Sequence, residues 1–205
     1  MNFMTGSLNN FPFFITLYMT MLVGNMVIIL MSKEKTDESI ANAATYDDLT
    51  GIFNRRTFLA YTRDNIALFT KRQKPISFLI MDLDHFKKIN DQHGHFVGDI
   101  VLKDFAATIS AQLRQEDIFG RIGGEEFTVL LPGTSGTEAV IIAERLKSSI
   151  EKSVVNDIHY TVSIGVVTVI PTETTTADLL YKTGDEALYI AKSKGRNRIE
   201  VAKTD

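Results

Sequence analysis

Two pairs of acidic residues stand where they could bind a cation. Asp82 and Asp84 lie at the end of the run ISFLIMDL, whose apolar composition predicts a strand buried on both faces. Their spacing puts both on one face of that strand. Glu125 and Glu126 directly follow a pair of glycines. Carboxylates in such places are costly to bury without compensation, and Mg²⁺ binds one or two of them together with substrate phosphates and water.

The acids therefore predict a magnesium site for a phosphate-bearing substrate, with solvated turn acids as the alternative for Asp84 and Glu126 taken alone. Gly123-Gly124 predicts a tight hairpin whose backbone can lie against a ligand, because glycine adopts positive φ freely. Lys192 and Arg196 are four residues apart, across the end of a predicted helix. These two basic residues could bind phosphate. The plainer explanations are that the glycine pair forms only a turn and that the basic pair is solvated.

The elements that must position these residues alternate between helix and strand. Helices are predicted at residues 50–73, 86–90, 98–113, 137–152 and 178–194, and strands at residues 76–83, 118–122, 127–131, 160–170 and 198–201. Gly165, inside one of these strands, predicts a bulge or a close approach of another backbone. The pattern favours an α/β (α+β) fold in which helices surround a mostly antiparallel central sheet.

The N-terminal part of the chain has a different composition. After a short tail, residues 1–10, the segment Phe11–Met31 contains no charged residue and is long enough as a helix to cross a membrane. A signal peptide fits poorly, because no basic region precedes the run, and a buried soluble helix is the remaining alternative. Lys33 and Lys35 follow directly, so the positive-inside rule predicts a single span with the remainder of the chain in the cytoplasm. Residues 32–46 predict a helical stalk, and residues 47–205 the catalytic domain.

The composition excludes several classes of protein. The 205-residue chain has a net charge of −3 and no cysteine. A nucleic-acid binder with a broad basic face is therefore excluded, as are disulfide scaffolds and thiolate metal sites.

Taken together, the motifs are far more specific than any one of them. DDLTGIFNRR, FLIMDLDHFKKINDQHGHFVGD, RIGGEEF, VSIGV and DEALYIAKSKGRNRI follow one another from Asp47 to Ile199. In this order they resemble the GGDEF family of diguanylate cyclases. The resemblance implies a fold similar to adenylyl cyclase and polymerase palm domains. It also implies a homodimer in which each subunit holds one GTP, and condensation of the two into cyclic di-GMP with release of pyrophosphate.

The resemblance also implies a role for individual residues. Asp82 and Glu125 correspond to the ligands of Mg²⁺, or alternatively Mn²⁺, with the Leu83 carbonyl as a further oxygen. Glu126 is a candidate for deprotonating the attacking 3′-hydroxyl, and lowering of the hydroxyl pKa by the metal is the alternative. Asn90 and Asp99 correspond to the residues that bind guanine. The remaining GTP contacts would come from the turn and helix start at His85, Phe86 and Lys87 and from Lys192 and Arg196.

Arg114 and Asp117 form an RxxD motif at the family's inhibitory position, which implies feedback inhibition by cyclic di-GMP. The chain departs from the family pattern in Glu125, which replaces the Asp of the family's name and retains a carboxylate, and in His85, Ile52 and Gly184. A catalytically silent GGDEF module that binds GTP or cyclic di-GMP is the alternative function. A cyclase for another nucleotide is disfavoured by Asn90 and Asp99.

Overall fold

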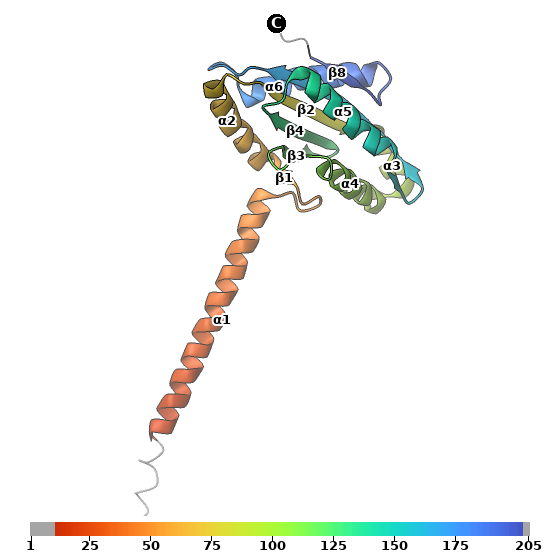
Figure 1. Ribbon diagram of the computed structural model, residues 1–205. Helices are drawn as coiled ribbons and strands as arrows, with labels where there is room; N and C mark the ends of the chain where they lie inside the picture. Colours follow the sequence, from red (N-terminus) through yellow and green to blue (C-terminus); the bar gives the residue numbers. More distant parts are fainter. Residues whose placement is uncertain (1–10, 203–205) are drawn as a thin grey trace, which may run out of the picture. The chain divides into compact units, whose positions relative to one another are not determined.

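The computed structural model describes residues 11–202, and for residues 11, 12, 30 and 32–44 it describes the backbone alone (Figure 1). The chain divides into two compact units, residues 1–44 and 45–205. Helix α1 (Phe11–Thr45) makes up the described part of the first unit. The predicted tail, residues 1–10, lies outside the described residues.

Helix α1 exposes apolar side chains along its described length. Phe14, Met21 and Ile29 expose 62%, 64% and 67% of their surface. Within the part of the chain that the structure describes, however, no helix is both long and apolar enough to cross a membrane. The prediction of a membrane span is therefore not confirmed, although the predicted helix is present. The structure does not describe the side chains of Phe11, Pro12 and Leu30, which belong to the predicted segment.

The second unit is built on a six-stranded sheet with strand order β1-β3-β4-β2-β7-β8. Its strands are β1 (Phe53–Asn54), β2 (Ile76–Leu83), β3 (Ile118–Gly123), β4 (Glu126–Pro132), β7 (Val162–Val169) and β8 (Ile199–Val201). The four central strands are antiparallel to one another, and the two edge strands are parallel to their neighbours. The prediction of a mostly antiparallel central sheet is confirmed.

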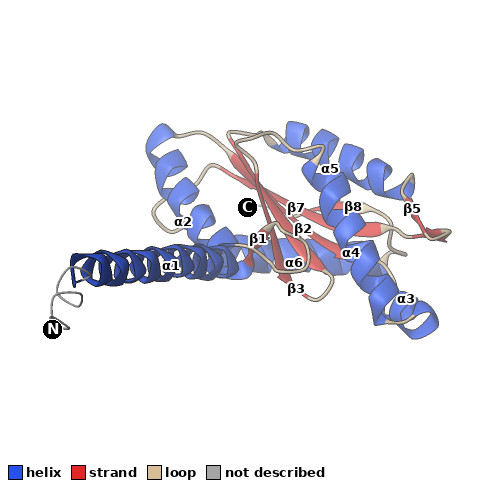
Figure 2. Cartoon of the chain, turned by 90° about the horizontal axis from the view of Figure 1, so that it is seen from below, coloured by secondary structure: helices blue, strands red, loops and turns tan. Residues whose placement is uncertain are grey.

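Helices cover both faces of this sheet (Figure 2). On one face lie α3 (Phe86–His93), α4 (His95–Ser110) and α5 (Gly136–Glu151); on the other lie α2 (Arg55–Arg72) and α6 (Ala177–Ser193). Along β2, Leu79 and Met81 belong to the first core and Phe78 and Ile80 to the second. This alternation explains why β2 is apolar at almost every position.

The helix predicted from residue 50 begins later, at Arg55, so that boundary was wrong. In the segment before α2, polar side chains form local hydrogen bonds with backbone amides. Asp47 Oδ1 accepts hydrogen bonds from the Thr50 amide at 3.0 Å and hydroxyl at 2.6 Å, which closes a turn. Asn54 then caps α2 by accepting from the Thr57 amide at 3.0 Å. The boundary predicted for helix α4 was also wrong, in the opposite direction: α4 begins at His95 and not at residue 98.

A short hairpin escapes the sequence prediction. Strands β5 (Val154–Val155) and β6 (Ile158–His159) pair with each other outside the main sheet. Asn156 and Asp157 between them have φ of 48° and 62°. Two consecutive left-handed residues are typical of the tight turn that Asn and Asp favour, so the signal was present in the sequence.

Gly165 on β7 allows α6 to approach the sheet closely. A Cβ at this position would lie 2.3 Å from the Gly184 carbonyl oxygen and 2.6 Å from the Leu188 nitrogen. The predicted close approach is confirmed. It also accounts for the departure at Gly184, where a Cβ would meet Ile80 Cγ2 at 3.1 Å. The tight packing sets the position of α6, whose last turn carries Lys192.

Candidate active site

Three of the predicted acidic residues come together where β2 ends beside the β3–β4 hairpin. Asp82 is the partner of Glu126 in the β2–β4 register. The amide of Leu83 donates to the Glu125 carbonyl oxygen at 3.4 Å. Asp82 is 5% exposed, and both glutamates are half-buried. Gly124, with φ of 50°, makes the turn that places Glu125 and Glu126 beside the strand end.

The protein compensates the charges of these acids only in part. Burial raises the pKa of Asp82, and a hydrogen bond and the positive charge of Lys192 oppose that rise. Burial also raises the pKa of Glu125 and of Glu126, and repulsion by Asp82 raises both further. The cluster therefore favours additional positive charge.

The donor set suits a divalent cation shared with phosphate. Among the side chains that the structure describes, no group of three or more His, Asp or Glu residues is arranged to hold a metal by itself. Mg²⁺ does not require one, because it binds through one or two carboxylates and takes its other ligands from phosphates and water. The carboxylates of Asp82 and Glu125, together with the backbone carbonyl of Leu83, match that requirement.

Lys192 and Arg196 bring positive charge to the cluster from the end of α6. Lys192 Nζ lies 2.8 Å from Asp82 Oδ2, and the charge of Arg196 also acts on Asp82. Helix α6 ends at Ser193, so the two basic residues lie on either side of the helix end, as their spacing predicts.

Asp84 has a different environment from Asp82, although both lie toward α6. Its carboxylate is 4% exposed and accepts hydrogen bonds from the hydroxyls of Thr161 and Ser163, both at 2.7 Å. Its Oδ2 also accepts from the Asn197 amide at 3.0 Å. Asp84 is therefore not a solvated turn acid. Its hydrogen bonds lead away from the Asp82–Glu125 cluster, although its charge repels Asp82 and helps to raise the pKa of Asp82.

The turn after β2 begins helix α3. His85 adopts a left-handed conformation with φ of 59° and accepts from the amides of Lys88 and Ile89 through its carbonyl. Phe86 and Lys87 are the first two residues of α3. Their N–H groups belong to the set that a helix leaves without internal acceptors, which suits an anion such as phosphate.

The predicted guanine-binding residues lie on neighbouring helices. Asn90 Oδ1 is buried and has no hydrogen-bond partner among the described residues. It lies against Gly98, where an added Cβ would be only 1.9 Å away. Asp99 follows Gly98 on α4 and is exposed. An unpaired buried amide oxygen is costly, so this site fits a ligand that donates a hydrogen bond.

Arg121 has a positioning role that the sequence analysis missed. Its guanidinium donates to the Gly124 carbonyl oxygen through Nε at 2.9 Å and Nη2 at 2.8 Å, and through Nη1 to Asp47 at 2.9 Å. Burial raises the pKa of Asp47, but hydrogen bonds from Thr50 and Arg121 outweigh that effect and lower it. Asp47 is the first residue of the motif DDLTG and Arg121 the first residue of RIGGEEF. Their place in these motifs was the sequence feature that could have pointed to the contact between them.

The RxxD pair forms a turn between α4 and β3. Asp117 Oδ2 accepts from the Arg114 amide at 2.8 Å, and the Asp117 amide donates to the Arg114 carbonyl at 3.1 Å. Arg114 and Asp117 line a cavity of about 210 Å³ together with Tyr46 and Phe53. Because the pair precedes β3 and the acid cluster follows it, the two sites lie at opposite ends of that strand.

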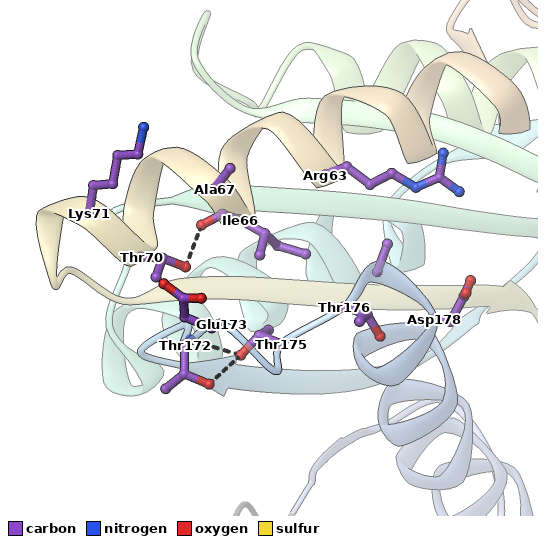
Figure 3. Close-up of a pocket in the computed structure, with 11 residues that line it drawn as sticks. Arg63, Ile66, Ala67, Thr70, Lys71, Thr172, Glu173, Thr175, Thr176 and Asp178 are labelled. Carbon is purple, nitrogen blue, oxygen red and sulfur yellow. Dashed lines mark hydrogen bonds between the residues drawn. The ribbon is translucent and has the colours of Figure 1, made fainter.

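A larger cavity of about 490 Å³ lies between α2 and the segment that joins β7 to α6 (Figure 3). Ile66, Ala67 and Ala177 contribute apolar surface, and Thr172 and Thr175 bond to each other there. None of the predicted site residues lines it.

Comparison with known proteins identifies the family to which this chain belongs. The family model described as "Diguanylate cyclase, GGDEF domain" matches residues 44–198. The response regulator PleD of Caulobacter vibrioides is 38% identical over 173 residues, 82% of this chain. Diguanylate cyclase DgcM of Escherichia coli is 38% identical over 174 residues, 84% of this chain. The chain spans only 38% and 42% of the lengths of these two relatives.

A solved structure gives the same match at the level of the fold. The active GGEEF domain of a diguanylate cyclase from Vibrio cholerae is 32% identical, with a TM-score of 0.69. The alignment covers 74% of this chain and 98% of that one.

Proposed function

Since the chain belongs to the GGDEF family of diguanylate cyclases, we propose that it condenses two molecules of GTP into cyclic di-GMP at the interface of a homodimer. The observation that carries the proposal is the convergence of Asp82, Glu125 and Glu126 with Lys192 at one end of the sheet. The acids retain the carboxylates that cation-assisted phosphoryl chemistry needs. The Vibrio cholerae relative is described as an active GGEEF domain, which supports activity with Glu125 at this position.

In the proposed reaction, the 3′-oxygen of one GTP forms a bond to the α-phosphorus of the other, and the bond to pyrophosphate breaks. Asp82 and Glu125, with the Leu83 carbonyl, would hold Mg²⁺ or Mn²⁺. When bound, the metal neutralises phosphate charge and lowers the pKa of the attacking hydroxyl. Glu126 is the nearby carboxylate available to accept the hydroxyl proton, because burial and Asp82 raise its pKa. A second, identical step closes the ring.

Binding and orientation of GTP are assigned to the residues around this cluster. Lys192, Arg196 and the first amides of α3 would bind the phosphates. Asn90 and Asp99 would bind the guanine base, which presents N–H donors that adenine lacks in that arrangement. The buried, unpaired Oδ1 of Asn90 supports this assignment.

The cellular location is also a proposal. The uncharged segment Phe11–Met31 and the exposed apolar side chains of α1 support attachment of the catalytic unit to the cytoplasmic face of the inner membrane. Fractionation of cells that express the full chain tests it: recovery in the membrane pellet is expected. Recovery in the soluble fraction contradicts the attachment.

The activity is tested by incubating the purified chain with GTP and MgCl₂ and identifying the products by mass spectrometry. Cyclic di-GMP and pyrophosphate are expected, and Glu125→Gln is expected to yield neither. Binding of GTP without formation of product would instead identify a catalytically silent module.

A further inference from the structure

We propose that Asp84 is a positioning residue that holds the turn after α6 so that Arg196 can bind the phosphates of GTP. The proposal rests on the proposed function, because that function assigns Arg196 to the phosphates. Asp84 would act through the backbone of the turn and not through contact with substrate or metal.

The turn that carries Arg196 has an unusual backbone. Gly195, Arg196 and Asn197 have φ of 112°, 63° and 47°. Three consecutive left-handed residues are unfavourable, above all for residues that carry a Cβ. Such a conformation persists only where its surroundings hold it.

Hydrogen bonds from three elements hold this turn. The Arg196 amide donates to the Ala191 carbonyl at 3.1 Å. The Asn197 side chain donates to Glu151 on α5 at 2.6 Å, and the Asn197 amide donates to Asp84 Oδ2 at 3.0 Å. Of these acceptors, Asp84 is the one that directly follows a strand of the central sheet.

The surroundings of Asp84 suit an anchor. Its Oδ1 accepts from Ser163 and its Oδ2 from Thr161 and Asn197. Among the ion pairs of the described residues, none includes Asp84. Three donors therefore satisfy this buried carboxylate and fix its orientation. Since Arg196 directly precedes Asn197, the bond to Asp84 determines where the arginine side chain begins.

Two conservative substitutions separate geometry from charge. In Asp84→Asn the amide oxygen can still accept from Asn197 and Thr161, while the new NH₂ group donates to the Ser163 hydroxyl, which can also accept. Asp84→Glu keeps the charge but moves the oxygens by one methylene. A positioning role predicts that Asp84→Asn keeps GTP affinity within about twofold and that Asp84→Glu weakens it about tenfold.

The experiment uses calorimetry on the full chain in the presence of Mg²⁺. It measures the Kd for a GTP analogue with a methylene bridge between the α- and β-phosphates, which the proposed reaction cannot consume. It includes both variants, Arg196→Ala and the double variant Asp84→Glu/Arg196→Ala. The double variant is expected to bind no more weakly than Arg196→Ala alone, since both changes remove the same interaction. Ser77→Ala is the matched control: it removes a buried hydroxyl that donates to the Thr134 carbonyl at 2.9 Å, near the other end of β2, so it should lower Tm and leave Kd unchanged.

Weak binding by Asp84→Asn, with normal binding by Asp84→Glu, would show that the charge matters and would overturn the proposal. Multiplicative losses in the double variant would do the same, as would a wild-type chain that binds no GTP. A wild-type chain that binds GTP but forms no product refutes the proposed cyclase activity alone, because these affinities remain measurable.

Discussion

Lys192 Nζ lies 2.8 Å from Asp82 Oδ2, which joins the last turn of α6 to the end of β2. Asp82 is the most buried acid of the cluster, and this contact gives it a direct cationic partner. Glu125 and Glu126 are affected by the same ammonium group only at longer range, and Asp82 repels both. Repulsion among the three carboxylates consequently destabilises the metal-free protein, and a bound cation with substrate would relieve that repulsion.

Glu125→Gln should abolish synthesis of cyclic di-GMP and yet stabilise the metal-free protein at neutral pH. Burial, followed by repulsion from Asp82, raises the pKa of Glu125 above its ordinary value of 4.5. The ionised form is thus less favourable in the folded chain than in the unfolded chain. The stability from the protonated form is fully present below pH 4.5 and is lost as the pH rises through the raised folded value.

Thermal unfolding in EDTA at pH 4 and pH 7.5 tests this expectation. A gain in Tm of about 1–3 °C is expected at pH 7.5 and none at pH 4. Glu186→Gln, on the exposed surface of α6, is the control and should change neither Tm nor activity. A lower Tm for Glu125→Gln at pH 7.5 would contradict the predicted charge strain.

Gly98→Ala should impair recognition of guanine by displacing Asn90, although the substitution removes no polar group. The added Cβ would lie 1.9 Å from Asn90 Oδ1 and 3.0 Å from Asn90 Cγ, so the asparagine must turn away. We expect the KM for GTP to rise about tenfold and discrimination against ATP to fall, and we expect the same two effects from Asp99→Ala.

Steady-state kinetics with GTP and competing ATP measures both effects. Gly136→Ala is the matched control, because its Cβ would meet Thr168 Oγ1 at an ordinary 3.6 Å. If Gly98→Ala retains the wild-type KM and selectivity, guanine binds elsewhere.

Sequence patterns predicted the central strands well because burial leaves a strong apolar signal. The run that forms β2 is apolar on both faces, and Gly165 marks the place where α6 approaches the sheet. The start of α2 was mispredicted because Asp47 and Asn54 close local turns that compete with the helix. Such competition depends on individual hydrogen bonds and leaves little periodic trace.

The candidate site was predictable residue by residue only through the motifs. Spacing alone did not separate Asp82 from Asp84, because both side chains point to the same side of the sheet. Their difference comes from three donors to Asp84: Thr161 just before β7, Ser163 on β7, and Asn197 in the turn after α6. These contacts join residues far apart in the chain, and a single sequence does not reveal them.

Assembly should control activity, because each subunit is proposed to hold one GTP. The specific activity of the full chain is expected to rise with protein concentration until dimers saturate. Removing residues 1–44, the first compact unit, should move that rise to higher concentration, since α1 no longer raises the effective concentration of the partners. Activity assays over a dilution series, with sedimentation velocity as control, test this. Concentration-independent activity of the truncated chain down to dilute conditions would exclude a shared site.

Arg114→Ala should abolish feedback inhibition by cyclic di-GMP while leaving initial rates nearly intact. The turn between α4 and β3 depends on the Arg114 backbone, whose amide donates to Asp117 Oδ2 at 2.8 Å. Alanine keeps that amide, so the substitution removes the guanidinium without opening the turn. Asp117→Ala would remove the acceptor itself, which makes Arg114→Ala the cleaner variant. Among the ion pairs of the described residues, none includes Arg114, so its side chain is available to bind phosphate or a guanine edge.

The measurement is a set of initial rates at increasing concentrations of added cyclic di-GMP. Loss of the guanidinium contact should raise the inhibitory concentration at least about tenfold, the effect of about 1.4 kcal/mol of binding free energy. Arg63→Ala, an exposed arginine on α2, is the control and should be inhibited like the wild type. Because the RxxD turn and the acid cluster lie at opposite ends of β3, a ligand at the turn would inhibit without competing for the acids. If added cyclic di-GMP does not slow the wild type, Arg114 and Asp117 form only a surface turn.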